Sequence, residues 1–201
     1  MTKPRIAFLC GSLRKDSFHR RLGQAIFAAT DRIECVPVEL GDLPLYNQDL
    51  DGKQALEAWA RFRDAVRPTD GVLFGSPEYN RSMTGALKNA LDVGSRPYGR
   101  SVFAKKPAAV FSASSGMTGG FGSNHALRQS CVFLDMPVMQ QPEAYWGLIN
   151  DDKIGLDGTV HDETVAKLVK AFANAFADWV DLIGHGRAKI APDPTQQAQA
   201  S

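Results

Sequence analysis

Short apolar runs alternate with longer helical stretches along most of the chain. Five runs have the length of buried strands: 5–10, 33–38, 71–75, 108–113 and, less clearly bounded, 137–139. Short apolar runs bounded by turn residues are consistent with strands that are buried on both faces of a sheet. These five runs are therefore the predicted strands.

Helical spacing of apolar residues marks the stretches between these runs and after the last one. The predicted helices cover residues 17–30, 56–66, 84–93, 123–134 and 165–183. Repeated alternation of strand and helix predicts an α/β fold, a parallel sheet covered on both faces with right-handed crossovers. We expect one domain over residues 1–187 and a disordered tail over 188–201, because the tail is polar and contains proline.

Three strand-to-helix loops have an unusual composition. In a doubly wound sheet the ligand lies outside the carboxyl ends of the strands, near the point where the strand order reverses. The loops 11–17, 76–82 and 112–122 follow the first, third and fourth predicted strands. They are the expected sites of binding.

The first loop has the features of a phosphate cradle. Ser17 stands where a helix begins, and a helix N-terminus offers free N–H groups and partial positive charge to an anion. Ser12 can donate a hydrogen bond, and Arg14 can bind two oxygens at once. A Walker loop is excluded by Asp16, and a dinucleotide loop by the presence of Gly11 alone. The alternative is that Ser17 only caps the helix and Arg14 is a solvated charge.

The loop after the third strand combines an aromatic ring with polar groups. Pro77 stiffens the chain, and Ser82 is the predicted cap of the next helix. Glu78, Tyr79 and Asn80 cannot all be buried in a core, and they suit a flat heteroaromatic ligand with polar edges. The loop after the fourth strand is rich in glycine, serine and threonine, which lets backbone N–H groups approach a ligand closely.

Three segments together resemble one known family. GSLRKDSFHR, SPEYNRSMTGALKNALD and SSGMTGGFGSNHALRQ look like the NADPH-dependent FMN reductase family of flavodoxin-like proteins. Its members include quinone, azo-dye and chromate reductases. The resemblance implies a three-layer sandwich with a five-stranded sheet of order 2-1-3-4-5, one FMN per subunit, and a homodimer or homotetramer.

The resemblance also implies the roles of individual residues. The FMN phosphate would be bound by Ser12, Arg14 and Ser17, with Phe18 and His19 beside them, although relatives often have Asn at position 19. The isoalloxazine ring would be lined by Pro77, Glu78, Tyr79 and Asn80 on one side and by Ser112, Ser114 and Gly116 on the other. No catalytic side chain and no metal are expected, since NADPH, with NADH as the alternative donor, passes a hydride to the flavin N5.

The same resemblance suggests where subunits meet. The segment LPLYNQD is similar to a stretch near the subunit contact, and Arg128 matches a position that some relatives use between subunits. Tyr46, Tyr145 and Trp146 lie in predicted non-helical segments and are the candidate contact aromatics.

Composition narrows the setting of the protein. A net charge of +1 argues against a nucleic-acid surface, and no apolar run is long enough to span a membrane. The N-terminus lacks the apolar core of a signal peptide, so we expect a cytoplasmic protein. Cys10, Cys35 and Cys131 are expected to be buried free thiols, without a zinc site.

Two alternatives remain open at the level of sequence. An electron-carrier flavodoxin would bind FMN without oxidising NAD(P)H, but such carriers are usually strongly acidic. A regulatory phosphate-binding domain would give no reason for the PEYN loop. The favoured hypothesis is an enzyme that reduces a small-molecule electron acceptor by a ping-pong mechanism.

Overall fold

A computed structural model describes residues 2–51 and 56–189 of the chain. Residues 190–201 of the expected tail lie outside the described residues. Residues 188 and 189 belong to the last helix, so the predicted domain boundary at 187 falls inside that helix.

Five parallel strands form the central sheet. They are β1 (Arg5–Cys10), β2 (Glu34–Val38), β3 (Gly71–Gly75), β6 (Ala108–Ala113) and β7 (Ala144–Trp146). Their spatial order is β2-β1-β3-β6-β7, which confirms the predicted order 2-1-3-4-5 once the main strands are numbered along the chain. The order reverses between β1 and β3, and the loops after these strands therefore flank the switch point.

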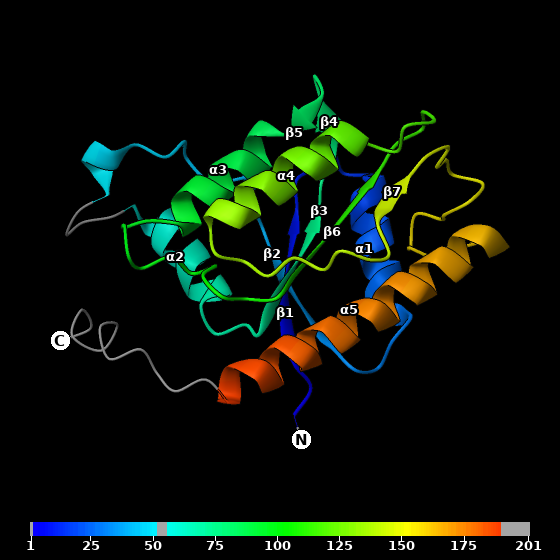
Figure 1. The fold of residues 1–201 in the computed structure, drawn as a ribbon. Helices are drawn as coiled ribbons and strands as arrows, with labels where there is room; N and C mark the ends of the chain where they lie inside the picture. Colours follow the sequence, from blue (N-terminus) through cyan, green and yellow to red (C-terminus); the bar gives the residue numbers. More distant parts are fainter. Residues whose placement is uncertain (1, 52–55, 190–201) are drawn as a thin grey trace.

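Helices cover both faces of this sheet, as Figure 1 shows. One face carries α1 (Phe18–Ala28) and α5 (Glu163–Lys189), and the other carries α2 (Glu57–Val66), α3 (Gly85–Gly94) and α4 (Phe121–Phe133). A short 3₁₀ helix, Gln48–Leu50, lies between β2 and α2. The structure therefore has the three layers that the sequence predicts.

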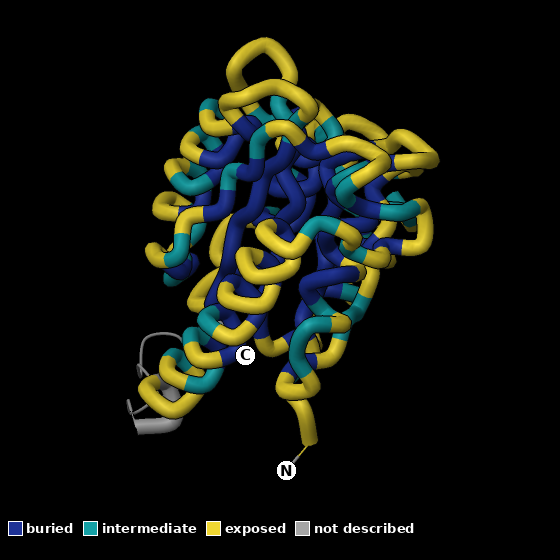
Figure 2. Tube along the Cα trace, turned by 90° about the vertical axis from the view of Figure 1, so that its right-hand side faces the viewer, coloured by how far each residue is buried: buried dark blue, intermediate teal, exposed yellow. Residues whose placement is uncertain are grey.

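Alternation along the strands builds a separate core on each face. Ile6 and Phe8 of β1 pack under α1 and α5, whereas Ala7 and Leu9 pack under α2 and α3. Figure 2 shows the buried strands inside a shell of exposed helix surfaces and loops. This rigid sheet holds the loops at its carboxyl edge.

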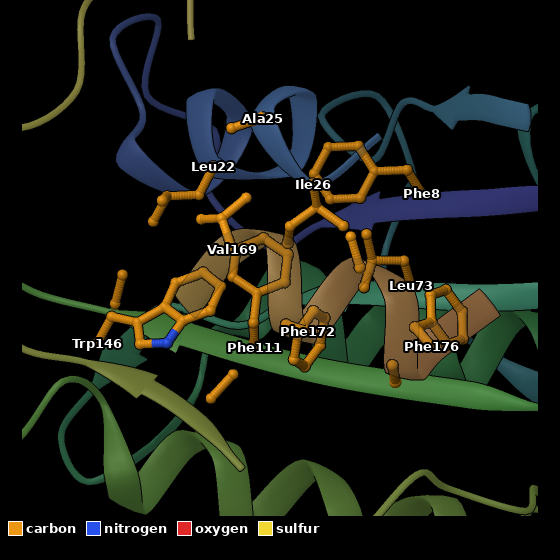
Figure 3. Packing of buried hydrophobic residues seen from close by; sticks show 14 of the residues in the cluster. Phe8, Leu22, Ala25, Ile26, Leu73, Phe111, Trp146, Val169, Phe172 and Phe176 are labelled. Atoms are coloured by element: carbon orange, nitrogen blue, oxygen red, sulfur yellow. The ribbon is translucent and has the colours of Figure 1, made fainter. Parts of the chain in front are cut away.

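Aromatic rings dominate the core beneath α1 and α5 (Figure 3). Phe111 stacks on Trp146 with centroids 5.8 Å apart, and Phe172 meets Trp146 edge-on at 5.8 Å. Trp146 is only 7% exposed, so its prediction as a subunit-contact residue is wrong. Its ring completes the core at the edge of the sheet instead.

The fifth strand lies later in the sequence than predicted. Val138 forms only an isolated bridge with Ala108, and the regular strand β7 begins at Ala144. Between them stands Pro142, which has no N–H to donate to a ladder. The chain therefore approaches β6 twice, and the apolar run 137–139 marks only the first approach.

The three cysteines differ in how far they are buried. Cys10 and Cys131 are buried free thiols, but Cys35 in the edge strand β2 is only half-buried, contrary to the prediction. Burial raises the pKa of Cys35 to about 11 and that of Cys131 to about 12.

Within residues 2–51 and 56–189, no helix is both long and apolar enough to cross a membrane.

Candidate functional site

Hydrogen bonds join the loops that leave the carboxyl ends of the central strands. The N–H of Gly11 donates to the Gly75 carbonyl at 2.9 Å, and the Thr84 hydroxyl donates to the Gly11 carbonyl at 2.7 Å. The Ser76 N–H donates to the Phe111 carbonyl at 2.9 Å. The three loops that the sequence singles out therefore form one connected surface at the upper edge of the sheet in Figure 1.

The first loop ends in a capped helix with free N–H groups. Ser17 is the N-cap of α1, and its side chain accepts a hydrogen bond from the Arg20 N–H at 3.3 Å. The N–H groups of Phe18 and His19 belong to the first turn, where no intrahelical acceptor exists. Ser12 is buried, and its hydroxyl accepts from the Arg14 N–H at 3.4 Å. This end of α1 can accept an anion through its backbone.

Arg14 is one of two exposed cations of this loop, beside Lys15. It forms no ion pair with any residue that the structure describes. It lines a cavity of about 350 Å³ between the first loop, Tyr79 and the start of α3. It also borders a second cavity of about 350 Å³, where Arg21 and Asp151 form an ion pair of 2.6 Å. Of these two arginines, Arg14 is the one whose charge stays unpaired.

His19 occupies a different position from the other residues predicted to bind the phosphate. Its ring is buried, and Nε2 accepts a hydrogen bond from the Ala113 N–H at 3.1 Å. Burial lowers the pKa of His19 to about 4, against a smaller effect of its hydrogen bond to the Ser76 backbone. The ring is therefore taken up by contacts within the protein, and only the His19 backbone N–H can face an anion.

The PEYN segment forms a small hairpin that sequence reasoning missed. Strand β4 (Glu78–Tyr79) pairs with β5 (Ser82–Met83) in antiparallel fashion, and Asn80 and Arg81 turn the chain with φ values of 51° and 66°. Two residues with positive φ are the mark of a type I′ hairpin turn, and Asn at its first position was the available signal. The hairpin exposes 59% of Tyr79 at the mouth of the cavity beside Arg14.

The capping of α3 also differs from the prediction. Thr84, and not Ser82, is the N-cap of this helix, and its hydroxyl accepts from the Leu87 N–H at 3.3 Å. Ser82 is instead paired with Tyr79 in the hairpin. Because Ser82 and Met83 form the second strand of the hairpin, the helix begins only after Thr84.

Contacts across the site tether the hairpin to the start of α4. Glu78 accepts a hydrogen bond from the Ser123 N–H at 3.1 Å and lies 3.7 Å from the Arg81 guanidinium. The Ser123 hydroxyl donates to the Pro77 carbonyl at 2.8 Å. Ser123 was not predicted as a site residue, because no local pattern pairs residues that far apart in the sequence.

The loop after β6 brings the remaining predicted residues to the same edge. Ser112 is fully buried, and its hydroxyl accepts from the Asn124 side chain at 3.4 Å, so its side chain is turned into the protein. Ser114 donates from its hydroxyl to the carbonyl of the exposed Gly116 at 3.0 Å. Gly119 has a φ of +60°, and a Cβ there would lie 2.3 Å from the Tyr145 carbonyl oxygen. A side chain is therefore excluded at position 119, because the loop packs there directly on the backbone of β7.

A further cavity of about 340 Å³ adjoins this loop and is lined by Arg81, Met117, Thr118, Phe121, Gly122 and Tyr145. A larger one, of about 670 Å³, lies at the opposite end of the sheet, beside Pro4, Asp70 and Pro107. In a parallel sheet the ligand belongs at the carboxyl edge, so the larger cavity is not the candidate site.

The donors at the carboxyl edge fit a phosphate joined to a planar ring. Free N–H groups at the α1 terminus and the unpaired Arg14 suit the phosphate, and an exposed tyrosine on a tethered hairpin suits the ring. A flavin mononucleotide has both parts. Together with the strand order, these features define the class of flavodoxin-like flavoproteins.

Comparison with known proteins identifies the family within this class. The family model of the NADPH-dependent FMN reductases matches residues 4–151, and the chain belongs to that family. It is an oxidoreductase that uses FMN, with NAD(P)H as the electron donor. The predicted family, enzyme class and cofactors are thus confirmed.

Individual relatives cover nearly the whole chain. A quinone reductase of Pseudomonas putida is 51% identical over 182 residues, covering 88% of this chain and 95% of the relative. A 2-hydroxy-1,4-benzoquinone reductase of a Burkholderia species is 40% identical over 178 residues, covering 88% and 96%. In structure, the flavoenzyme NAD(P)H:(acceptor) oxidoreductase FerB from Paracoccus denitrificans superposes with a TM-score of 0.84 at 37% identity, covering 89% of this chain and 98% of that one.

Proposed function

We propose that this protein takes electrons from NADPH through bound FMN and delivers them to a quinone or a similarly small acceptor. The observation that carries the proposal is the cavity at the switch point, which is bordered by both Arg14 and Tyr79. In the proposed site, the phosphate side and the ring side of the flavin would meet there. The names of the relatives at 51% and 40% identity favour a quinone among the acceptors.

The residues that would hold FMN divide into three groups. Ser12, Arg14 and Ser17, with the N–H groups of Phe18 and His19, would bind the phosphate. Pro77, Glu78, Tyr79 and Asn80 would border the ring on the hairpin side, and the backbone of 112–116 would border it on the other. Bound FMN supplies the hydride chemistry, accepting two electrons from the nicotinamide and passing them to the acceptor.

The task of the protein is then to bind and to orient. Glu78 is held by Ser123 and Arg81, so its carboxylate fixes the hairpin that carries Tyr79. Because Tyr79 is exposed, it can cover one edge of a planar ligand without losing core contacts. No protein nucleophile is required, since the reacting atoms belong to cofactor and substrates.

The alternative of an electron-carrier flavodoxin fits less well. A carrier is kept from direct reaction with NAD(P)H, whereas this chain belongs to a family named for that reaction. The near-neutral net charge of +1 also differs from the acidic surface that a carrier uses to dock with its partners. A cytoplasmic location and a homodimer or homotetramer remain part of the proposal.

Initial-rate kinetics test the proposed mechanism. If NADPH and the quinone use the same space beside the flavin in turn, double-reciprocal plots at several quinone concentrations will be parallel. Intersecting lines would require both substrates to be bound together and would contradict a shared site. Running the same assay with NADH would measure the preference between the two nicotinamides.

A further inference from the structure

One buried side chain contacts all three loops of the candidate site. His19 lies in the first turn of α1, directly after the phosphate loop. Its Nε2 accepts from the Ala113 N–H at 3.1 Å, at the start of the loop after β6. Its ring also lies beside the backbone of Ser76, in the loop after β3, and this contact raises the pKa of His19 against the larger effect of burial.

The direction of each bond defines the state of the ring. The Ser76 N–H donates to the Phe111 carbonyl, so the group that the His19 ring faces is the Ser76 carbonyl, which also accepts from the Ser123 hydroxyl at 3.3 Å. A ring that accepts at Nε2 has no proton on that nitrogen, so His19 is neutral and carries its proton on Nδ1. His19 therefore uses both of its nitrogens, one toward each neighbouring loop.

Packing prevents the ring from turning away to a ligand. His19 lies parallel to Phe111 with ring centroids 6.0 Å apart. On the β3 side, a Cβ added to Gly75 would come within 3.4 Å of the His19 Cβ, so the base of this side chain packs directly on the backbone of β3. The side chain is 6% exposed. It has neither the exposure nor a free nitrogen for a phosphate.

We propose that His19 is a positioning residue that holds the phosphate loop, the hairpin loop and the loop after β6 in register with one another. The proposal rests on the proposed function, because it concerns the flavin site that those loops form. It differs from the role implied by resemblance, in which His19 stands beside the phosphate. A residue that positions all three loops must affect the ring and the phosphate contacts together.

Substitution of His19 separates positioning from phosphate binding. His19→Leu preserves an apolar filling but leaves the Ala113 N–H unpaired, and His19→Gln retains one donor and one acceptor. For His19→Leu we expect the dissociation constants of FMN and of riboflavin to rise by the same factor, about tenfold. His19→Gln should recover most of that loss, because its amide can bond both backbone groups.

Two readouts distinguish positioning from a general loss of stability. At saturating FMN, anaerobic reduction by NADPH should be slower in His19→Leu than in the wild type, because the ring side of the site has moved. The control is Val180→Ala, which removes buried volume in α5 at the far end of the sheet and should lower the melting temperature without changing either flavin affinity. If Val180→Ala weakens the flavins equally, the effect is one of stability and the proposal fails.

Other outcomes would also overturn the proposal. A loss of FMN affinity with riboflavin unchanged would make His19 a phosphate residue. Unchanged affinity for both flavins would mean that the loops hold their places without it.

A measurement on the wild type covers the case in which His19→Leu does not fold. Nitrogen NMR of the apoprotein should find the His19 ring neutral, protonated at Nδ1, with the Ala113 amide hydrogen-bonded to Nε2. The opposite tautomer, or a ring in fast exchange with solvent, would contradict the assignment. This measurement needs no flavin, so it still tests the contacts of His19 with the neighbouring loops if the protein fails to bind FMN and the proposed function is wrong.

Discussion

At the scale of single residues, Arg14 is the side chain that most directly indicates a phosphate ligand. It is exposed, unpaired among the described residues and adjacent to the free N–H groups of α1. An FMN phosphate carries roughly −1.5 to −2 charges at neutral pH. An arginine can bind two of its oxygens at once, which a solvated surface charge would not do.

Replacing Arg14 by alanine should therefore weaken FMN selectively. A hydrogen bond to a charged group contributes about 1.5–3 kcal/mol, so the dissociation constant of FMN should rise about 10- to 150-fold. Riboflavin lacks the phosphate, and its affinity should hardly change. Titration of the apoprotein with both flavins measures this difference. Lys15→Ala is the matched control, since it removes a neighbouring exposed charge. If Arg14→Ala and Lys15→Ala weakened FMN binding equally, Arg14 would act only through its positive charge and not through a specific contact with the phosphate.

His19 gives a prediction about stability and pH. Its pKa in the folded protein is about 4, below the ordinary value of 6.5, so the unfolded chain binds the proton more readily. The contribution of the neutral His19 ring to the stability of the folded protein is therefore complete above pH 6.5, and it is lost as the pH falls from 6.5 toward 4. As the pH falls from 7 to 5, the titration of His19 alone should lower the free energy of unfolding by about 2 kcal/mol.

Urea unfolding of the wild type and of His19→Gln at these two pH values isolates the effect. The carboxylates titrate in both proteins, whereas glutamine does not titrate at all. The wild type should lose about 2 kcal/mol more than the variant between pH 7 and pH 5. Equal losses would mean that His19 is not held neutral in the folded state.

At the scale of elements, the regular core could be predicted and the irregular parts of the site could not. The apolar runs identify β1, β3 and β6 because a strand buried on both faces leaves a continuous apolar signature. The edge strand β2 is only partly buried, and its run was still long enough to recognise. The strand β7 has only three residues and lies beyond Pro142, so its signature is too short to recognise. A neighbouring run on the same edge was mistaken for it.

The site itself was predicted in part. The positions of the three loops follow from strand order, and Ser17 as a helix cap follows from its place before an apolar helix. The orientation of Ser112 and the tether between Glu78 and Ser123 depend on contacts between distant segments. Such contacts leave no periodic trace in a single sequence. The neutral, buried state of His19 was missed for the same reason.

The tether at the start of α4 can be tested by adding a single methyl group. A Cβ at Gly122 would lie 2.8 Å from the Arg81 carbonyl oxygen and 3.1 Å from the Glu78 carboxylate. Gly122→Ala should push the hairpin away from α4 and weaken FMN and riboflavin together, by roughly 5- to 30-fold for a strain of about 1–2 kcal/mol.

The matched control for that change is Gly184→Ala in α5, where no described atom beyond the adjoining residues and the helix's own backbone lies within 4 Å of the added Cβ. It should leave flavin binding unchanged and raise the stability slightly, since alanine favours a helix by up to about 1 kcal/mol over glycine. Flavin affinity that survives Gly122→Ala would show that the hairpin does not need its present position.

At the scale of the whole molecule, exposed apolar residues favour assembly. Val132 and Phe133 at the end of α4 are 77% and 80% exposed, and Leu45 is 79% exposed. Large apolar side chains that are exposed on a surface often mark an interface between proteins. We predict a homodimer or homotetramer by light scattering, with Phe133→Glu shifting the mass toward the monomer. A wild-type monomer with FMN bound and full activity would refute this.

The absorbance spectrum of the purified protein tests the central claim most directly. We expect a yellow protein with the two visible bands of oxidised flavin, and mild acid should release FMN. Anaerobic addition of NADPH should bleach these bands, and a quinone added afterwards should restore them. A colourless protein that does not take up FMN would contradict the flavin site. A yellow protein that stays oxidised when only NADPH or NADH is added would contradict the proposed reductase activity. It would favour the alternative of an electron-carrier flavodoxin.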